Sequence, residues 1–173
     1  MVARGCFLGK EFKEKCVGRK TTEGFVIILK ENGIEADESL AVKLQVEKDG
    51  IYKKIIKKKL KSVFRKKITD IILQLVERKK VLAVATSGSR EEVEIILGKD
   101  GLDLKKNFSY IVTGEDVKKG KPHPEIYRKV AKIARVKLNK CLVFEDTGVG
   151  VVSAFRAGMN VVAVPSEFTK GQD

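Results

Sequence analysis

Two adjacent carboxylates, Glu145 and Asp146, follow directly after the apolar segment 141–144. Gly148 and Gly150 come next, a pattern typical of a turn that leads into a helix. In an open α/β sheet, ligands bind beyond the carboxyl ends of the strands. Two neighbouring acids repel each other unless a cation lies between them, and hard oxygen ligands without histidine or cysteine suit Mg²⁺. The segment therefore predicts a magnesium site, and the alternative is a solvated loop with two acidic residues.

A second apolar segment, residues 80–85, ends in small hydroxylated residues. Thr86 and Ser87 stand at this strand end, and Ser89 suits the N-cap of the helix that follows. Hydroxyl and free backbone N–H groups at such a place form an anion site. Thr86 and Ser87 are therefore the predicted phosphate contacts, with ordinary turn and cap chemistry as the alternative.

Lys121 lies in a third segment, in which Pro122 and Pro124 fix the backbone on both sides of His123. A lysine held on such a stiff loop can neutralise a phosphoryl group as a compact charge. His123 is the only histidine of the chain and has no partner histidine or cysteine nearby in the sequence. We interpret it as a loop residue rather than a catalytic base.

In their order, spacing and position at strand ends, these segments resemble three motifs of the haloacid-dehalogenase-like (HAD-like) phosphohydrolases, with the β-phosphoglucomutase and sugar-phosphatase branch the most similar. The resemblance covers about residues 64–165 and, more loosely, the helical segment before them. It implies a Rossmannoid parallel α/β core over residues 64–173 and an N-terminal α-helical cap over residues 1–63.

The resemblance also implies a role for each residue that matches a motif. Asp146 would hold the catalytic Mg²⁺, with Glu145 as a second ligand or as an acid that orients the first. Thr86 and Lys121 are the implied catalytic residues: Thr86, aided by Ser87, would hydrogen-bond the transferring phosphoryl group, and Lys121 would bridge that group to the nucleophilic carboxylate.

The cap of this branch often supplies an arginine to the substrate after a Val-Gly or Val-Ser turn. Arg19, in Cys16-Val-Gly-Arg19, fits that position. The alternative is an ordinary surface arginine.

One motif of the family has no counterpart in this sequence. The family nucleophile is the first aspartate of Asp-x-Asp, at the end of an apolar strand near the N-terminus, whereas the first aspartate here is Asp37, with no strand before it. Phosphoryl transfer through an acyl-phosphate needs that carboxylate. We expect the first strand of the sheet to be missing, and the chain to be a piece of a larger hydrolase that is short at both ends and incomplete or inactive alone. The sequence leaves open whether the strand is absent from the gene, is absent only from this chain, or is supplied by a second chain.

The net charge of +13 is the main global peculiarity of the 173 residues. Lysines gather between residues 53 and 67 and alternate with apolar residues that are expected to form one face of a helix, namely Ile51, Ile55, Ile56, Leu60 and Phe64. Such a helix could bind nucleic acid or an anionic membrane. A solvated cap helix is the favoured interpretation, since few aromatic residues interleave with the charges and no known nucleic-acid motif is present.

Composition narrows the remaining classes. With 43% hydrophobic and 34% charged residues, the chain suits one domain with a small cap and is not disordered throughout. No apolar run is long enough to span a bilayer, and no signal-peptide pattern is present. Cys6, Cys16 and Cys141 have no metal-binding spacing. Three unpaired cysteines favour the reducing cytoplasm.

The elements expected to position these residues alternate between strands and helices. Strands are predicted at 81–85, 109–113, 141–144 and 161–164. Helices are predicted from Thr21 or Thr22 (as the cap) to Leu29, at about 37–61 with a break at Asp49-Gly50, and at 64–79, 90–97, 124–135 and 149–157. This order indicates a parallel sheet covered by helices on both faces.

The sequence thus predicts a Mg²⁺-dependent phosphatase or phosphomutase that acts on a small phosphorylated metabolite, a sugar phosphate, with no membrane partner. Phosphatase and mutase activities are not distinguished. A non-catalytic protein that binds phosphate and metal is the main alternative, and nucleic-acid binding through the lysine-rich helix is a weaker one.

Overall fold

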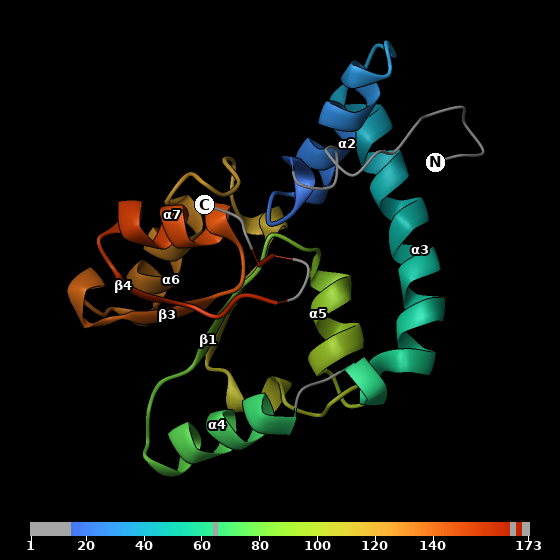
Figure 1. Ribbon diagram of the computed structural model, residues 1–173. Coiled ribbons are helices and arrows are strands. Elements are labelled where there is room, and N and C mark those ends of the chain that lie inside the picture. Colours follow the sequence, from blue (N-terminus) through green and yellow to red (C-terminus); the bar gives the residue numbers. More distant parts are fainter. Residues whose placement is uncertain (1–14, 64–65, 167–168, 171–173) are drawn as a thin grey trace.

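The computed structural model describes residues 15–63, 66–166 and 169–170. From β1 onward, strands and helices alternate along the chain (Figure 1). The helices are α2 (Thr21–Glu31), α3 (Glu38–Val63), α4 (Lys66–Glu77), α5 (Arg90–Leu97), α6 (Glu125–Ala134) and α7 (Gly148–Ala157). The strands are β1 (Ala83–Ala85), β2 (Tyr110–Val112), β3 (Leu142–Glu145) and β4 (Asn160–Ala163). The described residues also form three short 3₁₀ turns, at Lys105–Asn107, Gly114–Asp116 and Leu138–Lys140.

The four strands in the described part of the chain form two parallel pairs. β1 pairs with β2, which places Ala85 opposite Val112, and β3 pairs with β4, which places Glu145 opposite Ala163. Within the described residues no ladder joins β1 to β3, so each of these two strands keeps one backbone edge without a strand partner. The predicted α/β fold with parallel strands is confirmed.

A single hydrophobic core lies beneath both strand pairs. It contains Val112 from β2, Tyr127 from α6 and Ala154 from α7, and it packs against Ala85 of β1 and Val143 of β3. α6 and α7 therefore cover one side of all four strands (Figure 1). This shared layer of helices holds the two strand pairs in one unit.

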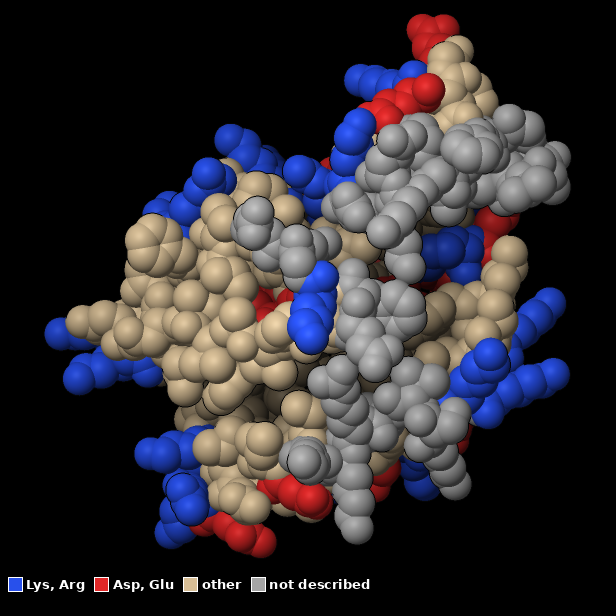
Figure 2. Space-filling model, viewed as in Figure 1, with Lys and Arg blue, Asp and Glu red and all other residues tan. Residues whose placement is uncertain are grey.

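The opposite side of β3 and β4 differs from the prediction. Leu142, Phe144 and Val162 are exposed, so the expectation of a sheet covered on both faces, and of a buried strand at 141–144, is wrong for this side of the described structure. Cys141 is only half-buried. Alternate residues of a strand point to opposite faces, and α6 and α7 cover only the face of Val143. Figure 2 shows the surface over β3 and β4 as largely uncharged, with lysines and arginines at its margin.

α2 and α3 pack against each other through a second apolar cluster of Phe25, Leu29, Ala41 and Leu44. We call this pair the α2–α3 hairpin; it lies beside the α/β part, where α3 runs along α5 (Figure 1). The boundary predicted at residue 63 between a cap and a core stays a prediction.

Two details of α3 correct the sequence analysis. The predicted break at Asp49-Gly50 is wrong, because the helix continues through both residues. Asp49 is buried on α3, which packs along α5, and tertiary contacts thus outweigh the weak helix propensity of the two residues. Of the predicted apolar face, Leu60 is buried, whereas Ile51 and Ile55 are exposed, because the contact with α5 follows a different stripe of the helix.

The helix starts show one correct and one wrong prediction. Ser89 is the N-cap of α5, and its hydroxyl accepts a hydrogen bond from Glu92 N, as predicted. The N-cap of α2 is Lys20 rather than Thr21 or Thr22, and this cap has no side-chain hydrogen bond. None of the described helices is long and apolar enough to cross a membrane.

Candidate active site

Lys121 and Glu145 form a buried ion pair at the ends of two strands. Glu145 is the last residue of β3, and Lys121 lies on the loop before α6. The Lys121 side chain is 7% exposed and that of Glu145 is 6% exposed. Lys121 Nζ also donates a hydrogen bond of 3.3 Å to the carbonyl oxygen of Ala85, the last residue of β1. One ammonium therefore lies where the carboxyl ends of β1 and β3 meet, as expected for the ligand site of such a sheet.

Two further hydroxyl groups hold the Glu145 carboxylate. Tyr127 donates a hydrogen bond to Oε1, the oxygen that Lys121 also contacts, and Thr147 donates one of 3.3 Å to Oε2. Gly150 permits this arrangement, because a Cβ there would overlap the carboxylate. Both carboxylate oxygens thus have donors, as a buried charge requires.

Tyr127 is a fixed hydrogen-bond donor in this cluster. Burial, and next the negative charge of Glu145, raise the pKa of the Tyr127 hydroxyl far above its usual value. The Lys121 ammonium also lies 5.2 Å from the centre of the Tyr127 ring, within the range of a cation–π contact. Tyr127 therefore helps to hold both members of the ion pair.

Tyr127 and Thr147 are not among the site residues predicted from the sequence. A signal for Tyr127 was present. In the predicted helix 124–135, apolar residues recur at helical spacing, namely Ile126, Tyr127, Val130, Ala131 and Ala134. A tyrosine hydroxyl buried on such a face needs a hydrogen-bond partner. Thr147 also caps α7, where its hydroxyl accepts a hydrogen bond from Gly150 N. Its use as a cap could have been predicted, but its contact with Glu145 could not.

Thr86 and Ser87 lie at the end of β1, half-buried, as predicted. The Thr86 hydroxyl accepts a hydrogen bond of 3.1 Å from Gly88 N, and the Ser87 hydroxyl donates one of 2.7 Å to Gly18 O. In this structure the Thr86 hydroxyl takes part in a local turn contact, whereas the Ser87 hydroxyl contacts a distant segment of the chain. Their phosphate contacts stay a prediction.

Asp146 is exposed, whereas its neighbour Glu145 is buried. Among the residues that the structure describes, no group of three or more His, Cys, Asp or Glu side chains is placed to hold a metal ion. Mg²⁺ is commonly bound by only one or two carboxylates, with water and substrate phosphate as its other ligands. The donors present fit Mg²⁺ in this way, with Asp146 as the accessible carboxylate and Glu145 already occupied by three donors.

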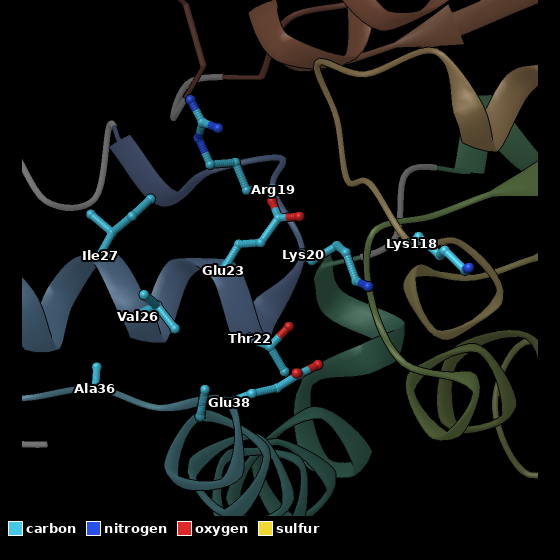
Figure 3. A pocket seen from close by; sticks show the side chains of 10 residues that line it. Arg19, Lys20, Thr22, Glu23, Val26, Ile27, Ala36, Glu38 and Lys118 are labelled. Atoms are coloured by element: carbon cyan, nitrogen blue, oxygen red, sulfur yellow. The ribbon is translucent and has the colours of Figure 1, made fainter.

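Arg19 borders a cavity of about 580 Å³ beside the start of α2 (Figure 3). Lys20, Glu23 and Lys118 line the same cavity. The Nε of Arg19 donates to Lys15 O at 2.9 Å, and no hydrogen bond or ion pair between described residues joins Arg19 to the other predicted site residues. The structure thus brings Arg19 near the site loops without placing it in the Lys121 cluster.

Asp37, which has no described strand before it, and Asp103, which follows α5, have other contacts in the described structure. Asp37 accepts a hydrogen bond of 2.7 Å from Leu40 N at the start of α3, and Asp103 pairs with Lys106. The carboxylate that contacts Lys121 is that of Glu145. His123 also behaves as a loop residue: its Nδ1 accepts a hydrogen bond of 3.3 Å from Glu125 N.

Known proteins with similar sequences indicate the family of this chain. The family model for haloacid dehalogenase-like hydrolases matches residues 8–164. A phosphorylated carbohydrates phosphatase from Thermotoga maritima is 34% identical over 161 residues, which cover 87% of this chain and 68% of that protein. Protein CbbY from Rhodobacter capsulatus is 34% identical over 110 residues, which cover 59% of this chain and 47% of that protein.

A solved structure shows the same fold. A β-phosphoglucomutase from Clostridium difficile matches with a TM-score of 0.83 at 22% identity, over 97% of this chain and 74% of that one. The chain spans about half the length of two of the curated relatives that it matches. The predicted resemblance is therefore confirmed at the level of family and fold.

Proposed function

Since this chain belongs to the haloacid dehalogenase-like hydrolases, we propose that it acts in a Mg²⁺-dependent phosphatase or phosphomutase for a small phosphorylated metabolite, a sugar phosphate. The observation that carries the proposal is the buried Lys121–Glu145 pair at the ends of β1 and β3. The relative from Thermotoga maritima, described as a phosphatase of phosphorylated carbohydrates, supports the substrate class.

In this proposal Lys121 neutralises the phosphoryl group. Its ammonium is almost completely buried. A charge interaction is stronger in the protein interior than in water. Glu145 keeps a compensating charge beside it, and Tyr127 holds Glu145 in place. Thr86, at the end of the neighbouring strand, accepts a hydrogen bond from Gly88 N and would donate its own proton to a phosphoryl oxygen. Ser87 would do the same after turning from Gly18 O. Arg19 would bind a second anionic group of the substrate.

Asp146 would hold the Mg²⁺, which when bound would reduce the negative charge on the phosphoryl oxygens. Glu145 would act through Lys121 and by orienting the loop that carries Asp146, since Lys121, Tyr127 and Thr147 already occupy its carboxylate.

The nucleophilic carboxylate is proposed to come from outside the described residues, on a strand placed between β1 and β3. Two observations support this. β1 and β3 each keep an edge without a strand partner in the described structure, and Lys121 donates to the main-chain carbonyl of Ala85. A second chain is one source of that strand. Without it, the chain would bind phosphate but would not turn over a phosphate ester.

The proposed partner is thus a small phosphorylated metabolite rather than a nucleic acid. Lys48 and Lys53 of the lysine-rich helix α3 pair with Glu92 and Glu91 of α5, so part of its positive charge serves contacts within the chain. We also propose a cytoplasmic location, which the free thiols of Cys16 and Cys141 support.

The test measures two quantities: binding of inorganic phosphate by calorimetry, and hydrolysis of 4-nitrophenyl phosphate, each with Mg²⁺ and with a chelator. We expect binding without turnover, a loss of binding of about tenfold or more in Lys121→Met, and a loss of the Mg²⁺ effect in Asp146→Asn. Lys53→Met is the matched control, because it removes a half-exposed lysine of α3 whose ion-pair partner is Glu91 of α5.

Absence of phosphate binding, or binding unchanged in Lys121→Met, would contradict the proposal. Chelator-sensitive turnover by the chain alone would show that the nucleophile lies within it. Fusion of an apolar strand ending in Asp-x-Asp should create activity. Phosphate binding without turnover by that fusion would instead favour the non-catalytic alternative.

A further inference from the structure

The segment from Gly18 to Glu23 contacts the loops that follow β1 and β3. The Ser87 hydroxyl, after β1, donates a hydrogen bond of 2.7 Å to Gly18 O. After β3, Thr147 and Val149 lie against Gly18: a Cβ at Gly18 would be 2.7 Å from Thr147 Oγ1 and 2.6 Å from a methyl group of Val149. Gly18 also has a φ of +81°, a conformation that glycine adopts without strain.

The same segment contacts the loop that follows β2. Lys20 Nζ donates a hydrogen bond of 2.9 Å to Val117 O, and Glu23 Oε1 accepts one of 3.0 Å from Gly120 N. Each of these bonds joins residues 97 positions apart in the chain. In Figure 3 the Lys20 side chain extends from the start of α2 toward the loop that carries Lys118. Residues 18–23 therefore contact the loops after three different strands.

Gly120 immediately precedes Lys121, so Glu23 holds the backbone from which the catalytic lysine projects. Glu125 of α6 also binds this loop through its carboxylate, which accepts hydrogen bonds from Lys118 N at 2.9 Å and Lys119 N at 3.0 Å. Glu125 fixes the first part of the loop from its own helix. Glu23 fixes the last residue before Lys121 from the α2–α3 hairpin, a distant part of the chain.

We propose that residues 18–23 form a strap that holds the three loops in one arrangement, and that Glu23 is a positioning residue for Lys121. The consequence for phosphate rests on the function proposed above, in which Lys121 takes the phosphoryl group. A displacement of about 1 Å at a reacting group can lower a rate by about 100-fold, so a hydrogen bond at the neighbouring residue affects the chemistry. Movement of the α2–α3 hairpin would in this way be transmitted to Lys121.

The test uses the chain as it is and three readouts: hydrogen exchange of the Gly120 amide, chemical acetylation of Lys121 followed by mass spectrometry, and binding of inorganic phosphate. In Glu23→Ala we expect exchange and Lys121 acetylation to rise about five- to tenfold, as for one lost hydrogen bond, with weaker phosphate binding. Glu23→Gln keeps an oxygen acceptor for Gly120 N and should remain close to the wild type. Glu31→Ala, which breaks the exposed Lys15–Glu31 pair at the other end of α2, is the matched control.

Each outcome decides one part of the proposal. Unchanged exchange at Gly120 in Glu23→Ala would overturn the strap. Increased exchange with unchanged Lys121 acetylation would overturn the positioning role. If the wild-type chain binds no phosphate, the proposed function fails, but exchange and acetylation still decide the strap. Should Glu23→Ala fail to fold, Lys20→Met removes the other contact of the strap with this loop and is expected to raise the same two rates.

Discussion

Lysine–glutamate ion pairs occur in two regions of the chain and differ in their exposure to solvent. At the strand ends, Lys121 and Glu145 are 7% and 6% exposed, and the carboxylate receives hydrogen bonds from two hydroxyls as well as from the lysine. Between α3 and α5, Lys53 and Glu91 pair with about half of each side chain exposed to solvent. The residue types are the same, but only the first pair depends on its surroundings to compensate the loss of hydration.

A second pair between α3 and α5 lies between these extremes. Lys48 contacts both Glu92 and Asp49, and Asp49 is buried. Burial acts to lower the pKa of Lys48, but the two carboxylates outweigh it and raise the pKa. Asp49 Oδ1 lies 2.9 Å from Lys48 Nζ as an ion pair without the geometry of a hydrogen bond. The Lys48–Asp49 pair within α3 is therefore incomplete, whereas every oxygen of Glu145 has a donor.

The largest expected effect follows from removing one member of the buried pair. Lys121→Met leaves the Glu145 charge buried without its cation, so the free energy of unfolding should fall by about 3–5 kcal/mol. The double variant Lys121→Met/Glu145→Gln should recover part of this loss, since neither charge remains. Urea denaturation of the four proteins of this cycle measures the coupling, and additive losses would contradict a strongly coupled pair.

Tyr127→Phe should have the next largest effect, because it removes one donor from the Glu145 carboxylate. We expect a loss of about 1.5–3 kcal/mol in the free energy of unfolding near neutral pH. The Tyr127 pKa is raised in the folded protein, so above about pH 10 only the unfolded state releases this proton. Stability should therefore fall with rising pH from there, by up to about 1.4 kcal/mol per pH unit from this group. Urea denaturation at several pH values from 8 to 11 gives the free energy of unfolding as a function of pH. This free energy should fall less steeply with pH in Tyr127→Phe than in the wild type, and equal pH dependences would contradict this role.

Gly150→Ala tests the same cluster from the side of α7. Its new Cβ would overlap the Glu145 carboxylate, so either the acid or the helix must move. We expect a loss of about 1–3 kcal/mol, as for an overpacked interior site. Gly50→Ala on α3 is a useful control, since its Cβ would meet no atom within 4 Å. Equal thermal stabilities of the two variants would show that Glu145 is not tightly enclosed.

Local sequence patterns predict part of the buried cluster around Lys121 and Glu145. Local signals were sufficient for Ser89 as an N-cap, for Thr86 and Glu145 at strand ends and for Lys121 on the loop before a helix. The burial of Glu145 was predictable in principle: it lies two residues after Val143, whose side packs on the core, and therefore shares the same face of β3. By the same alternation Asp146 falls on the exposed side.

Contacts between distant segments were not predictable from local patterns. The bonds of Lys20 and Glu23 to the loop after β2 join residues 97 positions apart, and nothing in the residues around them indicates these partners. The exposed face of Leu142 and Phe144 was missed for the same reason. An apolar strand predicts that both faces are covered, but whether another segment covers them depends on tertiary structure.

The smallest effect is expected at the exposed pair of the comparison. Lys53→Met removes the partner of Glu91, but both side chains remain about half in solvent, so water replaces the lost contact. The free energy of unfolding should change by at most about 0.5 kcal/mol at moderate salt, and the small difference should disappear in about 1 M salt, where charges are strongly screened. Urea denaturation at both salt concentrations checks this. A loss as large as that of Lys121→Met would mean that burial does not separate the two kinds of pair, and that α3 depends on its charges to remain attached to α5.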